Sequence, residues 1–218
     1  APLDEAKQVT WTVGSDSYRC QNYALGTGIP IETRANADPI FARELEEGNA
    51  RRLTGALMMD WETRVASLML NTANVGSSTL TASAWTGSAS TPVNDVWTAI
   101  NNVSDATGYV PNRMLFGVQA WRSFVQHAQV RNSVMNPNVG AGGPLPMADA
   151  VARFFGMDSV LVGKAYRNTN EEGLALALSS IWADHVFAYY APAQPSVVEP
   201  SYAYSFRWTA PGLPNMVV

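Results

Sequence analysis

The sequence predicts an α+β fold, in which helices and strands are mixed without a repeating strand–helix–strand order. Two observations support this prediction. One unusually long helical segment covers residues 38–73, and shorter helical and strand-like segments then alternate irregularly over residues 92–208. With 218 residues, of which 47% are hydrophobic, the chain can bury a substantial core.

The first predicted element is a β-hairpin over residues 8–25. Polar and apolar residues alternate over 8–13, a Gly-Ser-Asp-Ser turn follows, and residues 18–25 form the second strand. Because an isolated two-stranded hairpin is marginally stable in water, we expect a neighbouring subunit to cover this one. Its aromatic residues Trp11, Tyr18 and Tyr23 are therefore predicted to be interface anchors.

The long helix over residues 38–73 has a clear start. Asp38 can accept hydrogen bonds from the first free amides, and Pro39 fits the first helical turn because its missing N–H has no partner there. A helix of this length spans roughly 50 Å, which is more than the core of a domain of this size requires. The segment is therefore predicted to be a spine.

The remaining elements are shorter and follow from hydrophobic periodicity and from residues that start or stop helices. Pro92 begins a helix that Gly108 ends. Further helices are predicted over 119–127 and 147–155, strands over 112–117, 160–163 and 202–208, one long strand or two in series over 174–191, and loops over 77–92 and 131–146.

Several large side chains are predicted to serve packing. Trp61 and Trp97 lie on apolar helical stripes and Trp182 in an apolar strand, so all three are predicted to be core residues. Met58, Met59 and Met69 are predicted to fill irregular gaps along the spine and not to bind a metal.

The composition disfavours several classes of function. A net charge of −4 with scattered Lys and Arg disfavours sequence-specific nucleic-acid binding. The apolar runs fall far short of the ~20 residues that span a membrane, and no signal segment opens the chain. The single cysteine, Cys20, excludes an internal disulfide and favours a reducing compartment. With only two histidines beside it, we expect no metal and no cofactor.

Neither histidine is well placed for catalysis in the sequence. His185 follows Asp184 in a predicted strand, where adjacent side chains point to opposite faces, and no Gly-x-Ser-x-Gly elbow is present. His127 is predicted to cap the C-terminal end of its helix as an imidazolium. A hydrolase that uses a serine and His185 stays open as a minor alternative. It would need His185 in a concave pocket beside a serine hydroxyl.

The order of these elements resembles the major capsid protein of tailed bacteriophages, with its Hong Kong ninety-seven-like fold. The resemblance covers nearly the whole chain. It rests on short segments in a fixed order: Tyr23-Ala24-Leu25 before Ile29-Pro30, the spine with Leu57, Glu62 and Ala66, Trp85 ahead of residues 92–95, then 108–112, 154–163 and 181–189.

The resemblance implies a structural protein without enzymatic activity. It would self-assemble through hexamers and pentamers into the icosahedral shell of a tailed bacteriophage or prophage that encloses the DNA genome. Scaffold and portal proteins would be further partners, with no sequence-specific nucleic acid and no membrane. The protein would be made in the bacterial cytoplasm and reside in the virion.

The resemblance also implies a domain organisation. Residues 1–34 would be the extended hairpin loop and link, 35–91 the peripheral domain, 92–190 the axial domain, and 191–218 the return strand to the peripheral domain. The N-terminal arm and last C-terminal strand of the family would be missing. The loop at 131–146 would crowd the centre of a hexamer or pentamer, with interface positions at Asn136, Pro137, Asn138, Gly142 and Pro144.

Two other functions remain open from the sequence. An encapsulin-like compartment shell would have the same fold but enclose cargo protein. A metal-free binding or adhesion module is the plainer alternative, and a hairpin that stands away from its own body would disfavour it.

Overall fold

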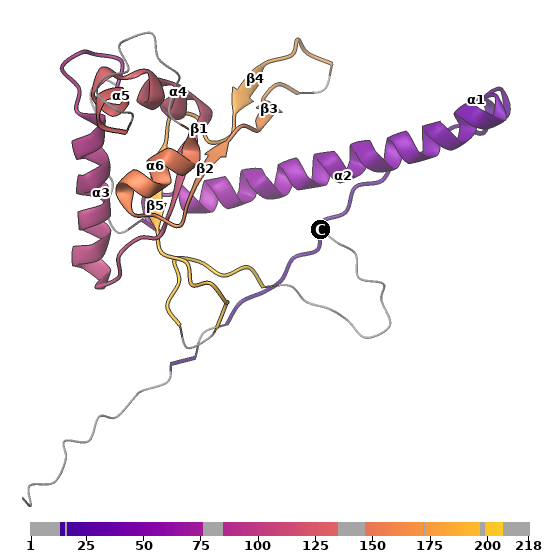
Figure 1. Ribbon diagram of the computed structural model, residues 1–218. Coiled ribbons are helices and arrows are strands. Elements are labelled where there is room, and N and C mark those ends of the chain that lie inside the picture. The colour runs from indigo at the N-terminus through magenta and orange to yellow at the C-terminus, as the bar shows by residue number, and fades with distance from the viewer. Residues whose placement is uncertain are drawn as a thin grey trace, which may run out of the picture.

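The computed structural model describes residues 14–15, 17–75, 85–134, 147–171, 173–196 and 199–206, with the backbone alone given for 39–43. A small mixed sheet lies at the centre of a helical body, and one long helix runs outward from it (Figure 1). The predicted mixture of helices and strands is confirmed.

Six helices and five strands make up this part of the chain. The helices are α1 (Ile31–Ala35), α2 (Pro39–Met69), α3 (Pro92–Thr107), α4 (Val118–Gln126), α5 (Ala128–Val134) and α6 (Ala148–Phe155). The strands are β1 (Arg113–Gly117), β2 (Ser159–Gly163), β3 (Tyr166–Asn168), β4 (Leu178–Ser180) and β5 (Val186–Tyr189).

The central sheet has the order β2-β1-β5. β1 pairs in parallel with β2 and antiparallel with β5. Because parallel neighbours need a crossover connection, α4, α5 and α6 carry the chain from β1 to β2. The sequence predicts no repeated strand–helix–strand order, and among the described strands only β1 and β2 are joined by such a crossover. Periodicity identifies the strands but does not say which of them pair.

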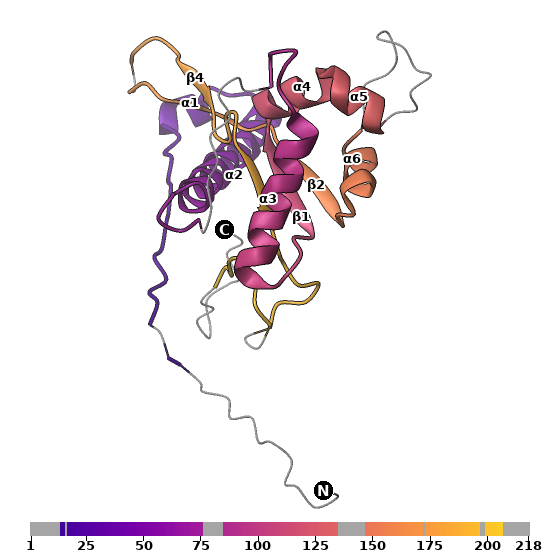
Figure 2. The same cartoon turned by 90° about the vertical axis from the view of Figure 1, so that its left-hand side faces the viewer.

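β1 divides the interior into two cores, because successive strand side chains point to opposite faces. Met114 and Phe116 belong to the larger core, which they form with residues of α3, α4, α5 and α6. Leu115 belongs to the smaller core, where it meets Ala66 of α2 and Trp182. The helices α3–α6 thus cover one face of the sheet, and the C-terminal end of α2 covers the other (Figure 2).

Aromatic rings fill the larger core. Trp85 packs against Phe116 and Phe124, with ring centroids 6.4 and 5.4 Å away. The indole N–H of Trp85 donates a 2.7 Å hydrogen bond to Asp95 on α3. This bond fixes the chain ahead of α3, although the sequence predicted only a loop there.

Helix boundaries are the most accurate part of the sequence prediction. α3 begins at Pro92 and ends before Gly108, whose φ of 74° is the left-handed conformation that glycine adopts readily. α6 ends in the same way at Gly156, with a φ of 69°. α2 begins at Pro39 as predicted but ends at Met69, four residues before the predicted end at 73.

The segment at 174–191 forms two strands in series, the second of the two predicted alternatives, separated by a turn in which Ala183 has a φ of 42°. Other predicted elements differ from the structure. Residues 202–206 form no strand, and residues 31–35 form α1 instead of an extended link. Trp97 is 39% exposed, with its ring edge against Phe155, so its predicted core position is wrong.

Candidate intersubunit surfaces

α2 is attached to the body by its C-terminal end. Ala66 is buried there, and Val65, Met69 and Leu70 pack around the same small core. Glu62 accepts a 2.7 Å hydrogen bond from the indole N–H of Trp182, which is 4% exposed. Trp182 is thus a core residue as predicted, but it lies in the turn before β5.

Most of α2 extends beyond this attachment (Figure 1). Apolar side chains remain exposed along it, and their exposed fractions are 36% for Leu45, 43% for Met58, 42% for Met59, 44% for Trp61 and 63% for Leu68. The predicted core role of Trp61 and the gap-filling role of Met58 and Met59 are therefore wrong within one chain, whereas Met69 packs against the small core as predicted. Hydrophobic periodicity predicts which side chains of α2 share an apolar face. It does not show whether the surface that buries this face belongs to the same molecule.

The segment before α1 contains no strand over residues 17–30, so the second strand of the predicted hairpin is absent. Tyr18 stacks on Phe206 at 4.4 Å between centroids, and the Cys20 thiol lies 3.9 Å from the Phe206 carbonyl oxygen. The Arg64 guanidinium of α2 lies 3.4 Å from the centroid of the Tyr23 ring. This segment therefore touches its own body, while Tyr18 stays 68% exposed and Tyr23 39% exposed.

The other predicted interface residues lie outside the described part of the chain. These are Trp11 and the five loop residues Asn136, Pro137, Asn138, Gly142 and Pro144. The structure describes the start of their loop: α5 continues to Val134, so the predicted loop at 131–146 begins inside a helix.

A Ser–His pair occurs at a hollow beside α4, and it was not foreseen. The Ser90 hydroxyl lies 3.2 Å from Nε2 of His127 and donates a 2.6 Å bond to the Gly87 carbonyl. Nδ1 of His127 accepts a 3.2 Å hydrogen bond from the backbone N–H of Gln129. Nε2 therefore carries the proton and donates to the Gly87 carbonyl at 3.3 Å.

This arrangement does not activate the Ser90 hydroxyl. A general base needs an unprotonated nitrogen toward the hydroxyl, whereas the free lone pair of His127 is already used by Gln129. His127 is the residue that ends α4, as predicted, and its ring also caps the start of α5 through the N–H of Gln129. The ring ties the segment at 87–90 to the junction of α4 and α5.

His185 is exposed and lies just before β5. It does not line the hollow beside α4 or the hollow between α2 and the β3–β4 pair. The Ser–His pair at the hollow beside α4 uses His127 and Ser90, not His185.

Burial affects the pKa of two tyrosines in the described part of the chain. Burial raises the pKa of Tyr189, and the hydrogen-bonded Arg113 guanidinium opposes this shift. Burial alone raises the pKa of Tyr202. Among the residues that the structure describes, no group of three His, Cys, Asp or Glu is placed to hold a metal ion. In the same residues, no helix is both long and apolar enough to cross a bilayer.

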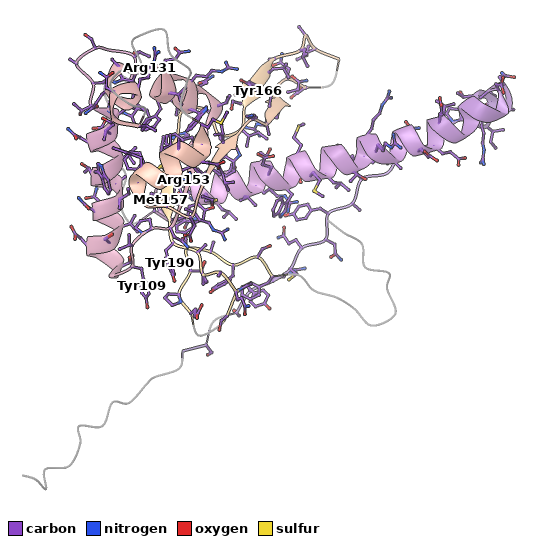
Figure 3. All side chains as sticks on the ribbon, in the orientation of Figure 1. Tyr109, Arg131, Arg153, Met157, Tyr166 and Tyr190 are labelled. Atoms are coloured by element: carbon purple, nitrogen blue, oxygen red, sulfur yellow. The ribbon has the colours of Figure 1, made fainter. Side chains whose placement is uncertain are left out.

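Two tyrosines form a further exposed aromatic feature at the end of α3. Tyr109 and Tyr190 lie side by side in Figure 3, with ring centroids 5.2 Å apart. Asn112 holds the two chain segments together: its amide nitrogen donates to the Ala191 carbonyl at 2.8 Å, and its amide oxygen accepts from the Ala191 N–H at 2.9 Å. The sequence signal was the Gly108–Asn112 stretch, noted above only for its order in the chain.

Comparison with known proteins gives two similarities, while no protein-family model matches the chain. The chain is 24% identical over 187 residues to the major capsid protein of Burkholderia phage BcepMu, which covers 82% of this chain and 58% of that protein. Its fold is similar to that of a crystal structure of a phage-related protein from Bordetella bronchiseptica RB50, with a TM-score of 0.57, 23% identity, and coverage of 77% of this chain and 54% of the other. Together they support a phage capsid-like protein. The chain spans little more than half the length of either relative.

Proposed function

We propose that this chain is a structural subunit that self-assembles into the icosahedral shell of a tailed bacteriophage or prophage around the DNA genome. The proposal rests on the capsid similarity and on one structural observation, the outward course of α2 with its uncovered apolar side chains (Figure 1). A soluble monomer gains nothing from exposing Met58, Trp61 and Leu68, whereas each large apolar side chain that a neighbour buries contributes up to about 1.5–3 kcal/mol.

The proposed domain organisation follows the capsid fold. Residues 1–34 reach toward an adjacent subunit, 35–91 form the peripheral domain with α2 as its spine, 92–190 form the axial domain, and 191–218 return to the peripheral domain. Trp11, Tyr18 and Tyr23 contribute to contacts along the first of these segments. Asn136, Pro137, Asn138, Gly142 and Pro144 pack near the centre of a hexamer or pentamer.

A structural role needs no reactive centre, because a shell subunit works through complementary patches repeated around closed symmetry. Scaffold and portal proteins are the proposed further partners, and the virion is the proposed location.

An encapsulin-like compartment shell is the second candidate, since it shares the fold. The contents of isolated particles distinguish the two. Particles from a lysed bacterial culture that hold nuclease-protected DNA support the phage shell, whereas particles filled with one protein cargo support the compartment.

The proposal is tested on the complete gene product by size-exclusion chromatography with light scattering and by negative-stain electron microscopy. We expect closed particles of megadalton mass. Monomers or small oligomers alone, with scaffold and portal proteins supplied, would contradict the proposed function.

A further inference from the structure

The β3–β4 pair forms a ribbon that leaves the body above α2, with Tyr166 labelled near its base in Figure 3. Its hydrogen bonds continue beyond the two short strands. The Thr169 N–H donates to the Ala177 carbonyl at 2.9 Å, and the Asn168 side-chain oxygen accepts from the Ala177 N–H at 3.0 Å. The Leu174 N–H then donates to the Glu171 carbonyl at 3.2 Å. The described arms of the ribbon, 166–171 and 174–180, are therefore held together beyond the two strands.

Three leucines line this ribbon at every second position. Leu174, Leu176 and Leu178 are 65%, 70% and 61% exposed, and a spacing of two places them on one side of an extended chain. We call these three residues the leucine row. A preformed apolar surface loses little conformational entropy when it is covered, which favours a binding role over chance exposure.

A stripe of similar length lies on α2, with three apolar residues and one arginine at its N-terminal end. Its members are spaced by seven, three and seven residues and therefore share one face of the helix: Arg51, Met58, Trp61 and Leu68. We call these four residues the α2 stripe. Met58 and Leu68 are about 15 Å apart along the helix axis, and Leu174 and Leu178 are about 13 Å apart along the extended chain.

The two surfaces cannot meet within one molecule. The base of the ribbon, at Arg167 and Ser180, lines the same hollow as Thr63, Ala66 and Ser67 of α2. A period of 3.6 residues places those three positions on the face of α2 opposite the stripe. Among the described residues, the leucine row of the same molecule therefore does not cover the α2 stripe, and the contact of Tyr23 with Arg64 leaves Met58, Trp61 and Leu68 exposed.

Residues of opposite charge lie near the two surfaces, one at the end of the leucine row and one at the end of the α2 stripe. Arg51 stands two helical turns before Met58, is 84% exposed and lies 3.7 Å from Glu47, a long distance for an ion pair. Glu171 is exposed at the ribbon tip, three residues before Leu174. With Leu174 beside Met58 and Leu178 beside Leu68, the ribbon tip lies toward Arg51.

We propose that the leucine row of one copy of this chain docks on the α2 stripe of a second copy, with Glu171 facing Arg51. The choice of a second copy as partner rests on the proposed shell function. The contact joins two different surfaces of the same chain, so it repeats from subunit to subunit and closes only where the rotation allows.

The contact is tested by mixing two variants of the complete gene product, W61C and L176C, in which Cys20 and any cysteine outside residues 1–218 are replaced by serine and which carry tags of different size. A short bis-maleimide then reports only intermolecular proximity. We expect a heterodimer band from this mixture and little from W61C mixed with V110C, because Val110 is 65% exposed but lies far from the ribbon in sequence and fold. Equal or absent cross-linking in the two mixtures would overturn the proposal.

Charge reversal tests the alignment of the contact. Glu171→Arg on the L176C chain or Arg51→Glu on the W61C chain should each lower the cross-linking yield several-fold, and the two together should restore it. Cross-linking that is unaffected by either reversal would contradict the pairing of Glu171 with Arg51. Circular dichroism confirms that each variant is folded.

The outcomes separate the contact from the proposed function. Normal particles from a Leu176→Asp variant would overturn the contact and leave the shell function standing. A protein that shows the specific cross-link but never forms particles would overturn the shell function and leave the contact standing.

Discussion

The joint between α2 and the sheet gives the sharpest prediction about stability. Trp182 is 4% exposed, and it packs with Ala66 and Leu115 in the small core. A Cβ added at Gly163 would overlap its indole, so the ring lies directly on the β2 backbone. Trp182→Ala should therefore lower the free energy of unfolding by about 3–5 kcal/mol, the usual cost of removing a large buried aromatic side chain.

The hydrogen bond from Trp182 to Glu62 can be measured separately by a double-mutant cycle of Trp182→Phe and Glu62→Ala. A bond to a charged acceptor contributes roughly 1.5–3 kcal/mol, and the partial exposure of Glu62 reduces this to a coupling of about 1–1.5 kcal/mol. Equilibrium urea unfolding followed by circular dichroism gives the four free energies, because it does not depend on the fluorescence of the deleted ring.

The control for this cycle is Glu44→Ala, which removes an exposed carboxylate from the other end of the same helix. It should change stability by less than about 0.5 kcal/mol and show no coupling to Trp182→Phe. If the Glu62 and Trp182 variants are additive within about 0.5 kcal/mol, the bond does not hold α2 on the sheet.

The remaining predictions concern glycines and tyrosines. Gly117→Ala should lower the free energy of unfolding in urea by about 2 kcal/mol or more, because the alanine Cβ would overlap the carbonyls of Trp182 and Ala183. An unchanged unfolding midpoint would contradict this close approach. Gly55→Ala makes the same substitution on α2 at a position where the added Cβ meets no other atom, and it should raise the free energy of unfolding by about 0.5–1 kcal/mol. A decrease in the free energy of unfolding would show that the α2 backbone is covered there. Burial raises the pKa of Tyr202 above its usual value of 10.0, so the contribution of Tyr202 to stability should be constant below pH 10 and be lost as pH rises through the higher folded-state value. Tyr202→Phe should reduce the pH dependence of thermal unfolding in this range, and an identical slope would contradict this prediction.

The sequence predicts local structure well where single residues control the backbone. Pro92 and Gly108 bound α3, and Gly156 ends α6, because proline and glycine restrict or permit particular backbone angles regardless of tertiary context. The strands at 113–117 and 159–163 are also recognised within one residue of their bounds. Their parallel pairing is not, since it depends on contacts between residues far apart in the chain.

The surfaces are harder to predict than the elements. Trp61 and Met58 fit a core pattern, yet they are exposed because the body covers only the end of α2. The alternation over 174–191 was recognised, but the turn at Ala183 and the exposed leucine row were not, because alternation alone does not distinguish a buried strand from a projecting ribbon. Six of the eight predicted interface residues lie outside the described residues and remain predictions.

The attachment of α2 at one end makes the helix a lever. From Glu62 to Leu70 the attached part is about 12 Å long, whereas the part from Pro39 to Glu62 is about 35 Å long at 1.5 Å per residue. A sideways force at the far end therefore acts on the Trp182 joint with roughly threefold leverage. A neighbour that supports the far end shortens the lever arm, so each subunit added to an assembly would reduce the torque that its partner's joint must resist.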